Sequence, residues 1–265
     1  MAGSLSVIGT ATSLLSYGGI TILTDPNFLH RGQKAYLGKG MWSTRRTEPS
    51  LQPTGLPPFD AVVLSHLHGD HFDRVARRSL PKEVPVFTTR QAARRLRLQG
   101  FVNAVALDTW QSYEITKRGA RLRVTSAPGR HAQGRLQAAL PQVMGSVLEF
   151  SAPGEPDLSV YVTGDTLLIE DLRELPRGHP HLDLGLWHLG GTRIPFGRGM
   201  LVTMDAAMGA DLLEIVHPDR TVPIHNDDYG VFTSPRDAFL AEVDRRGLTG
   251  VRAVDRGETV PLPLP

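Results

Sequence analysis

Residues that can bind metal ions are concentrated in one short segment of the chain, which reads SHLHGDHFD. His66 and His68 lie two residues apart, so in an extended segment their side chains leave the same side and can bind one ion. Gly69 permits a sharp turn, after which Asp70 and His71 face a neighbouring position. The segment is therefore predicted to contribute ligands to two adjacent metal ions.

Three further residues of the same chemical types come at the ends of other predicted strands: His131, Asp165 and His225. Rigid strands can direct such side chains to one shared edge. We expect His131 to complete the first metal site, His225 to complete the second, and Asp165 to bridge the two ions. The chain has no cysteine, so thiolate ligands are excluded. Imidazole and carboxylate ligands suit Zn, Fe, Mn or Ni, and ligand type alone leaves this choice open.

Such a site predicts hydrolytic chemistry. Two divalent ions carry four positive charges, and offsetting them with Asp70, Asp165 and a bridging hydroxide leaves about one net positive charge to hold an anionic or strongly polar oxygen. Metal binding lowers the pKa of water from ~15.7 towards ~7, which yields a nucleophile at neutral pH. We expect the bridging hydroxide to attack the substrate and Asp70 to act as a catalytic residue that accepts or relays its proton.

The elements that position these residues begin with short β-prone runs. Residues 13–17 and 20–24 are joined by two glycines, a signal for a hairpin. Residues 27–59 are rich in Gly, Pro, Arg and Ser without a clear period, which predicts a long surface excursion with a functional role. A buried strand over 60–64 leads directly into the His-rich segment. Further strands are predicted over 84–88, 102–107, 112–116, 121–126, 146–150, 158–163, 182–189 and 221–224.

Four helices are predicted. Two cover residues 72–80 and 90–99, and we interpret their many arginines as a solvated surface, with a phosphate-attracting face as the alternative. Thr203 can cap a third helix, in which Asp205 suits the positive N-terminus. Ser234, followed by a proline and then an acid, resembles the start of a fourth. Strands dominate the first half and alternate with helices in the second, which favours a sheet-on-sheet core with helices outside.

Composition indicates an ordinary globular protein. The 265 residues, 40% of them hydrophobic, suffice for a substantial core, and no linker divides the chain, so we expect a single domain over 1–265. A net charge of +2 is too small to indicate a nucleic-acid partner. The beginning of the chain lacks the pattern of a secretory signal, and no apolar run reaches the roughly 20 residues of a membrane span. A cytoplasmic protein is expected, with a homo-oligomer left open.

The order of these residues resembles the signature of the metallo-β-lactamase superfamily, His-x-His-x-Asp-His followed by a separate His, an Asp and a last His. Every position of this signature is occupied, and the matching residues are spread over nearly the whole chain: His66, His68, Asp70, His71, His131, Asp165 and His225. The resemblance implies an α/β fold, the αββα four-layer sandwich, in which two packed mixed β-sheets carry helices on their outer faces and metal ions at one edge. It also implies two divalent ions, with zinc expected and Mn or Fe as alternatives.

Asp25, within the sequence LTDP, resembles the family's early aspartate, which usually orients a metal ligand. Within the superfamily, this motif and the His-rich segment are most similar to the branch of the N-acyl-phosphatidylethanolamine phospholipase D enzymes and ascorbate-6-phosphate lactonase. That similarity implies a dinuclear metal-dependent hydrolase acting on a phosphodiester, lactone or related acyl bond of a small-molecule or lipid-like substrate. The sequence NDDY after the last histidine departs from the phospholipase pattern, so the substrate does not carry over.

Three residues are candidates for the wall of a substrate pocket. His188 ends a buried-looking strand and is followed by two glycines, although a core histidine bonded to backbone groups fits the pattern equally well. Asp228 and Tyr229 follow the last predicted ligand closely and could contact the substrate, or could belong to a polar turn.

Other functions remain open at this point. A ribonuclease Z-like nuclease would need an RNA-clasping arm, for which the length leaves no obvious room. A di-iron redox protein is disfavoured because such relatives usually have a glutamate at the position of His68. A non-catalytic metal-binding sensor is disfavoured because degenerate relatives normally lose ligands, and none is missing here.

Overall fold

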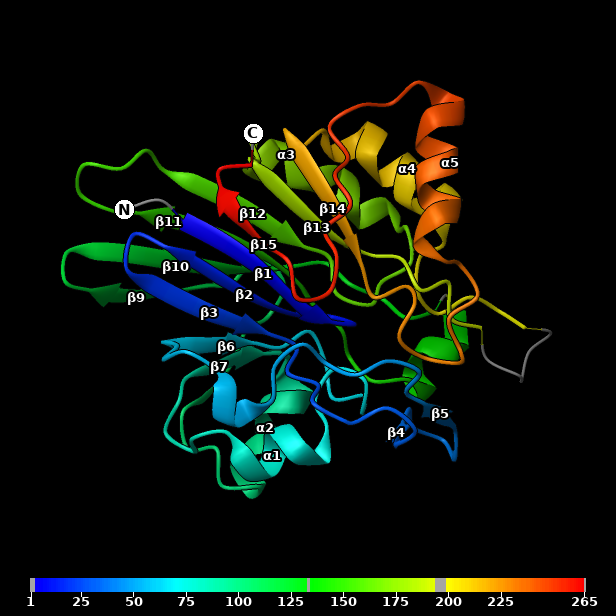
Figure 1. The fold of residues 1–265 in the computed structure, drawn as a ribbon, viewed down its shortest axis with the longest axis horizontal. Helices are drawn as coiled ribbons and strands as arrows, with labels where there is room; N and C mark the ends of the chain where they lie inside the picture. The colour runs from blue at the N-terminus through cyan, green and yellow to red at the C-terminus, as the bar shows by residue number, and fades with distance from the viewer. Residues whose placement is uncertain (1–2, 133, 194–198, 265) are drawn as a thin grey trace.

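The structure, a computed structural model, describes residues 3–132, 134–193 and 199–264. Its first sheet contains both ends of the described chain, because β15 pairs antiparallel with β1, as Figure 1 shows. Pairing is antiparallel from β15 to β3 and parallel from β3 through β8, so the sheet is mixed. In spatial order its strands are β15 (Thr259–Leu262), β1 (Gly3–Gly9), β2 (Thr12–Tyr17), β3 (Ile20–Thr24), β6 (Ala61–Val63), β7 (Val86–Thr88) and β8 (Ala104–Ala106).

The second sheet is also mixed. Its antiparallel part is formed by consecutive strands, whereas β12, β13 and β14 are parallel to one another. In spatial order its strands are β14 (Arg220–Ile224), β13 (Leu184–His188), β12 (Leu158–Val162), β11 (Gly145–Ser151), β10 (Ala120–Ala127) and β9 (Ser112–Lys117).

Alternating side chains in these strands create the core between the two sheets. In β10, Leu122 and Val124 are buried while Arg121 and Arg123 are exposed, which is the period of two expected of a strand with one covered face. Leu122 and Val124 pack in one cluster with residues of the opposite sheet, among them Leu15. The sheets therefore stack face to face, and burial of this shared apolar surface stabilises the sandwich.

Helices cover the outer faces of both sheets (Figure 1). On the first sheet, Ala76 of α1 and Leu96 of α2 pack against strand residues such as Val62. On the second sheet, Leu213 of α4 and Phe239 of α5 belong to one apolar cluster with residues of β11 to β13. The helices are α1 (Arg74–Ser79), α2 (Arg90–Leu98), α3 (Leu175–Gly178), α4 (Ala206–Val216) and α5 (Arg236–Arg246), with short 3-10 turns at Pro53–Gly55, Gly134–Ala139 and Glu170–Glu174.

These four layers confirm the predicted αββα sandwich of two mixed sheets. The glycine hairpin is also confirmed, since Tyr17 pairs with Ile20 across it. Within the described ranges, every helix is too short or too polar to cross a membrane.

The predicted excursion over 27–59 contains regular structure that the sequence did not indicate. Strands β4 (Lys34–Tyr36) and β5 (Trp42–Thr44) form a separate two-stranded hairpin within it. Strands β1 and β15 were not predicted either.

Two predicted helix caps are wrong. The N-cap of α4 is Asp205, whose carboxylate accepts from the backbone N–H of Met208, whereas Thr203 lies before the helix. Ser234 does not cap α5. Its hydroxyl accepts from the backbone N–H of Ala206, so it supports the first turn of α4 from a distant part of the chain.

Candidate metal centre

The predicted ligands meet at one edge of the sandwich because each follows the carboxyl end of a strand. His66 to His71 lie in the loop after β6, and His131 follows β10. Asp165 and His225 follow β12 and β14, which run in the same direction in the second sheet. All seven predicted residues are brought together, in two groups whose nitrogen and oxygen atoms lie within 4.8 Å of one another.

The first group consists of His66, His68 and His131. Nε2 of His66 lies 2.9 Å from Nδ1 of His68, and the rings of His66 and His131 are 4.6 Å apart between centroids. Burial, followed by the charge of neighbouring histidines, lowers the pKa of His66 well below its ordinary value. The same causes lower the pKa of His68 to about 3. These rings are therefore neutral, which is the form that binds a metal ion.

The second group consists of Asp70, His71, Asp165 and His225. His71 Nε2 lies 3.3 Å from Asp165 Oδ2, and His225 lies 3.4 Å from Asp70 and 3.2 Å from Asp165. Burial acts to lower the pKa of His71, but the carboxylates of Asp165, Asp25 and Asp70 outweigh it and raise that pKa well above its ordinary value. Several buried carboxylates thus converge on a small volume, which favours a cation there.

The residues fit divalent ions, because many of their polar atoms are buried without a hydrogen-bond partner. Such atoms are rare in folded proteins and need an explanation. Among the seven predicted ligands, the unpartnered atoms are His68 Nε2, Asp70 Oδ1, His71 Nε2, His131 Nε2, Asp165 Oδ1, and both ring nitrogens of His225. Imidazole nitrogens and carboxylate oxygens that share a dry cluster are ligands suited to zinc or a similar ion.

Ser65 sets the orientation of two of these histidines. Its hydroxyl has a single proton, which it donates to the Asp25 carboxylate at 3.0 Å. The same oxygen lies 3.0 Å from His66 Nδ1 and 3.2 Å from His71 Nδ1, so both nitrogens must act as donors towards it. The Nε2 atoms of His66 and His71 are thereby directed towards the cluster.

Asp25 is at the centre of this supporting network. Besides Ser65, its Oδ2 lies 3.2 Å from His71 Nδ1 and 3.4 Å from His188 Nε2. Burial acts to raise the pKa of Asp25, but the adjacent His71 and His188 outweigh it and hold the pKa at about 2. Asp25 and His225 both adopt left-handed backbone conformations, with φ of 36° and 60°, and strain of this kind is often found at functional sites.

Two further orienting contacts escaped the sequence interpretation. His131 Nδ1 lies 2.8 Å from the carbonyl oxygen of Val202 and must donate to it, which leaves Nε2 as the free lone pair. Thr203, misassigned as a helix cap, donates its hydroxyl to Asp165 Oδ2 at 3.0 Å. Both contacts come from the segment before α4, where no motif indicates them. Aliphatic and hydroxyl side chains such as those of Val202 and Thr203 do not resemble metal ligands, so the sequence does not indicate their role.

The turn predicted at Gly69 is present, because the backbone N–H groups of His71 and Phe72 both donate to the carbonyl of His68. The backbone of Gly69 is not in the left-handed region, so the conformation of this turn does not itself require glycine. Instead a Cβ at this position would lie 2.7 Å from the backbone nitrogen of Tyr36 and 2.9 Å from its oxygen. Gly69 is required because the β4–β5 hairpin packs directly on the metal-binding loop.

The three residues predicted for a pocket wall are all buried. His188 lies beside the second group, where Nδ1 contacts the Thr163 hydroxyl at 3.1 Å and Nε2 faces Asp25. Asp25, His71 and His188 form a third group of potential ligand atoms, which shares His71 with the second. His188 is thus placed to orient Asp25.

Asp228 and Tyr229 mainly secure neighbouring segments. Oxygens of Asp228 accept from the backbone N–H of Thr10 and from the side chains of Thr47 and Arg256. The hydroxyl of Tyr229 donates to Asn27 at 2.9 Å. These partners occupy the groups with which the two residues would contact a substrate, so the structure favours the polar-turn interpretation.

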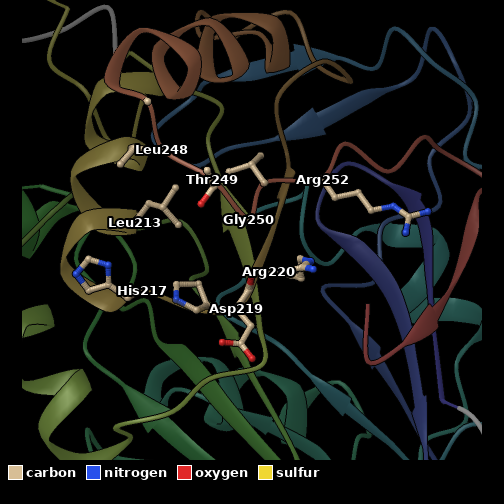
Figure 2. Close-up of a pocket in the computed structure, with 11 residues that line it drawn as sticks. Leu213, His217, Asp219, Arg220, Leu248, Thr249, Gly250 and Arg252 are labelled. Carbon is tan, nitrogen blue, oxygen red and sulfur yellow. Dashed lines mark hydrogen bonds between the residues drawn. The ribbon is translucent and has the colours of Figure 1, made fainter. Parts of the chain in front are cut away.

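A separate cavity of about 580 Å³ lies away from this edge, between the ends of α4 and α5 and the start of β14 (Figure 2). Its polar lining includes His217, Asp219 and Thr249 but none of the predicted ligands. Asp219 also belongs to a group of potential ligand atoms with His181 and Asp183, but that group is largely exposed, whereas the groups at the sheet edge are almost entirely buried.

An αββα sandwich with histidines and aspartates clustered at one sheet edge defines the class of metallo-β-lactamase-type proteins. Residues 21–226 match the family described as the beta-lactamase superfamily domain, and the chain belongs to that superfamily. A UPF0173 metal-dependent hydrolase of Deinococcus radiodurans is 28% identical over 96% of this chain and 97% of its own length.

Two other similarities concern the branch and the fold. The mitochondrial N-acyl-phosphatidylethanolamine-hydrolyzing phospholipase D of Saccharomyces cerevisiae is 25% identical over 62% of this chain and 34% of the yeast protein. The crystal structure of a possible metal-dependent hydrolase from Veillonella parvula has a TM-score of 0.82 at 22% identity, and the match covers 99% of this chain and 100% of that one. The family therefore includes metal-dependent hydrolases, and the fold agrees with that membership.

Proposed function

We propose that this protein is a dinuclear metal-dependent hydrolase that cleaves an ester-like bond, such as a phosphodiester, a lactone or a related acyl bond. The proposal is carried by the pair of adjacent ligand groups, in which several buried nitrogen and oxygen atoms have no hydrogen-bond partner outside the two groups. Hydrolysis by two ions of this kind needs a compact, dry cluster of nitrogen and oxygen ligands open to one substrate.

The residues have distinct tasks in this proposal. His66, His68 and His131 hold one ion, and Asp70, His71 and His225 hold the other. Asp165 would bridge them, because its carboxylate lies 3.3 Å from His71 and 3.2 Å from His225, and the ring centroid of His71 is 4.2 Å from that of His66 in the first group. We favour zinc, with manganese or iron as alternatives, because imidazoles outnumber carboxylates among the ligands.

Ions at this place supply Lewis-acid charge and lower the pKa of water enough to give a nucleophile at neutral pH. Asp70 is the catalytic residue of the chain itself. Its Oδ1 is buried without a partner, while Oδ2 faces His225 at 3.4 Å. If one oxygen of Asp70 held an ion, the other would be left to accept the proton of an attacking water. Asp25 and Ser65 act through the histidines that they orient, and do not touch the substrate.

The bond class is supported by the relatives. The yeast relative is a phospholipase D, and the Deinococcus relative is a metal-dependent hydrolase. The first description agrees with hydrolysis of a lipid-like substrate, and the second agrees with metal-dependent hydrolysis.

The proposal is tested by assaying the full chain, purified without chelators, on a panel of model phosphodiesters, lactones and thioesters. We expect turnover of at least one ester-like class. His131→Ala should abolish it by removing an ion ligand. His181→Ala should not, because that histidine is exposed and precedes β13, whose opposite end lies at the cluster. Metal-replete protein that is inert on the whole panel would instead support a sensor or binding module.

A further inference from the structure

A groove next to the metal-binding loop carries an unusual combination of aromatic and cationic side chains. Its volume is about 480 Å³, within the range of small-molecule sites, and it lies between the β4–β5 hairpin and helices α1 and α2. Gly69 of the metal-binding loop is part of its wall. The groove therefore begins beside the proposed ligands His68 and Asp70.

The hairpin provides the aromatic wall of the groove. Tyr36 and Trp42 are directly paired in the hairpin register, and their ring centroids are 4.8 Å apart. Trp42 is 58% exposed and Tyr36 is 47% exposed. Large aromatic side chains held at the surface beside a concavity are typical of binding sites. Leu29 and Phe72 extend this apolar wall.

The helices provide the positive charge. Arg74 and Arg77 of α1, Arg95 of α2 and Lys34 of the hairpin line the groove. Among the ion pairs found within the described ranges, none involves these four side chains.

The one acid in the lining, Asp73, does not balance this charge. It is buried, and its carboxylate accepts from the backbone N–H groups of Phe28, Leu29 and Ala76. The groove therefore presents a net positive charge to solvent, which complements an anion.

The groove is joined firmly to the metal centre. Gly69 donates its backbone N–H to the Tyr36 carbonyl at 2.8 Å, and a Cβ on Gly38 at the hairpin tip would lie 3.6 Å from His68 Nε2. The wall of the groove that the hairpin forms is consequently placed directly against the loop that carries the proposed ligands.

From this geometry we propose that the groove is the substrate-recognition subsite, and that it binds an amphiphilic anion: a phosphate or carboxylate joined to an apolar chain or ring. The apolar part packs on Trp42 and Tyr36, and the anionic group pairs with Arg77 and Arg95. This inference rests on the proposed function, because it assigns the substrate class of that site. It also gives a binding role to arginines of the two Arg-rich helices, for which the sequence alone favours a solvated surface.

The test is calorimetric titration of the full chain with monomeric octyl phosphate. We expect saturable binding that weakens with added salt, because exposed charges are screened. The double variant Arg77→Ala/Arg95→Ala and the single variant Trp42→Ala should each weaken binding by about tenfold or more. Octyl glucoside, which keeps the chain but lacks the anion, should bind much more weakly.

The matched control is Arg78→Ala/Arg94→Ala, which removes the same charge from exposed positions of the same helices that do not line the groove. It should bind octyl phosphate as the unaltered chain does. Equal weakening in this control would overturn the proposal, because general charge rather than the groove would then explain binding.

A further variant separates this inference from the proposed function. His131→Ala impairs the metal centre and should keep binding octyl phosphate. Binding that is lost in His131→Ala but kept in the groove variants would place the anion on the metal ions, which contradicts the groove and leaves the hydrolase proposal intact. Adhesion to phosphatidylglycerol vesicles without binding of monomeric octyl phosphate would identify a membrane-binding face and would also overturn the proposal.

Discussion

Gly69 donates its backbone N–H to the carbonyl of Tyr36 across 2.8 Å, and this bond fastens the metal-binding loop to the β4–β5 hairpin. The contact leaves no room for a side chain, since a Cβ on Gly69 would meet two backbone atoms of Tyr36 at 2.7 and 2.9 Å. Backbone atoms cannot swing aside as a flexible side chain can. Either the loop or the hairpin must move if Gly69 is replaced.

We predict that Gly69→Ala destabilises the protein by about 1–3 kcal/mol, the usual range for overpacking, and weakens octyl phosphate binding. Urea denaturation and calorimetry measure the two effects. Gly55→Ala is the control, because its Cβ would make only an ordinary contact at 3.7 Å with Leu51. If Gly69→Ala were as stable as the unaltered chain, the tight contact between loop and hairpin would be wrong.

Replacement of Asp25 should weaken metal binding although Asp25 is not among the proposed ligands. Asp25→Asn keeps the size of the side chain but removes the negative charge that faces His71 and His188. Loss of such a supporting contact typically lowers metal affinity 10–100-fold, and we expect about that much in a competition assay with a chromogenic chelator. Asp60→Asn is the control, since Asp60 pairs with Lys117 away from the cluster. Unchanged affinity in Asp25→Asn would show that the network around Ser65 does not orient the ligands.

The convergence of the candidate ligands could be predicted from the sequence because the ends of buried strands are easy to locate. Runs such as Asp-Ala-Val-Val-Leu before His66 indicate a buried strand, and the carboxyl ends of parallel strands meet at one edge. That logic predicts which ligand-type residues converge, and the structure brings all seven together.

Contacts between distant segments could not be predicted in this way. Ser234 supports the first turn of α4, although it stands immediately before α5 and has the local pattern of a cap for that helix. Gly69 shows the same limit, because its neighbour Tyr36 is known only once the hairpin is placed. The carbonyl of Val202 orients His131, and a backbone group carries no sequence signal. Local patterns predict elements, whereas these relationships depend on packing.

The contribution of Glu242 to the free energy of unfolding should depend on pH. Hydrogen bonds from Arg245 and Arg246 hold its pKa at about 2, below the ~4.3 expected in the unfolded chain. A carboxylate with a depressed pKa in the folded state contributes stability above its unfolded pKa, and loses that contribution as the pH falls towards 2. The free energy of unfolding of the unaltered chain should therefore exceed that of Glu242→Gln at pH 7, and the difference should shrink between about pH 4.5 and 2.

The measurement is urea denaturation of both proteins across this pH range. High salt should reduce the difference at pH 7, because the ion pairs are near the surface. Glu83→Gln, at an exposed position in the turn before β7, is the control for loss of a glutamate. A difference that grew on acidification would contradict the assigned role of Glu242 in linking Arg245 and Arg246.

We propose that the sheet edge binds two metal ions through seven residues, of which Asp165 is shared by both sites. Elemental analysis of the reconstituted full chain, set beside its Asp165→Ala variant, tests this most directly. We predict about two ions per chain in the unaltered protein, and both a lower metal content and no hydrolysis in Asp165→Ala. One ion or fewer per unaltered chain, or full activity in Asp165→Ala, would contradict the two-ion account.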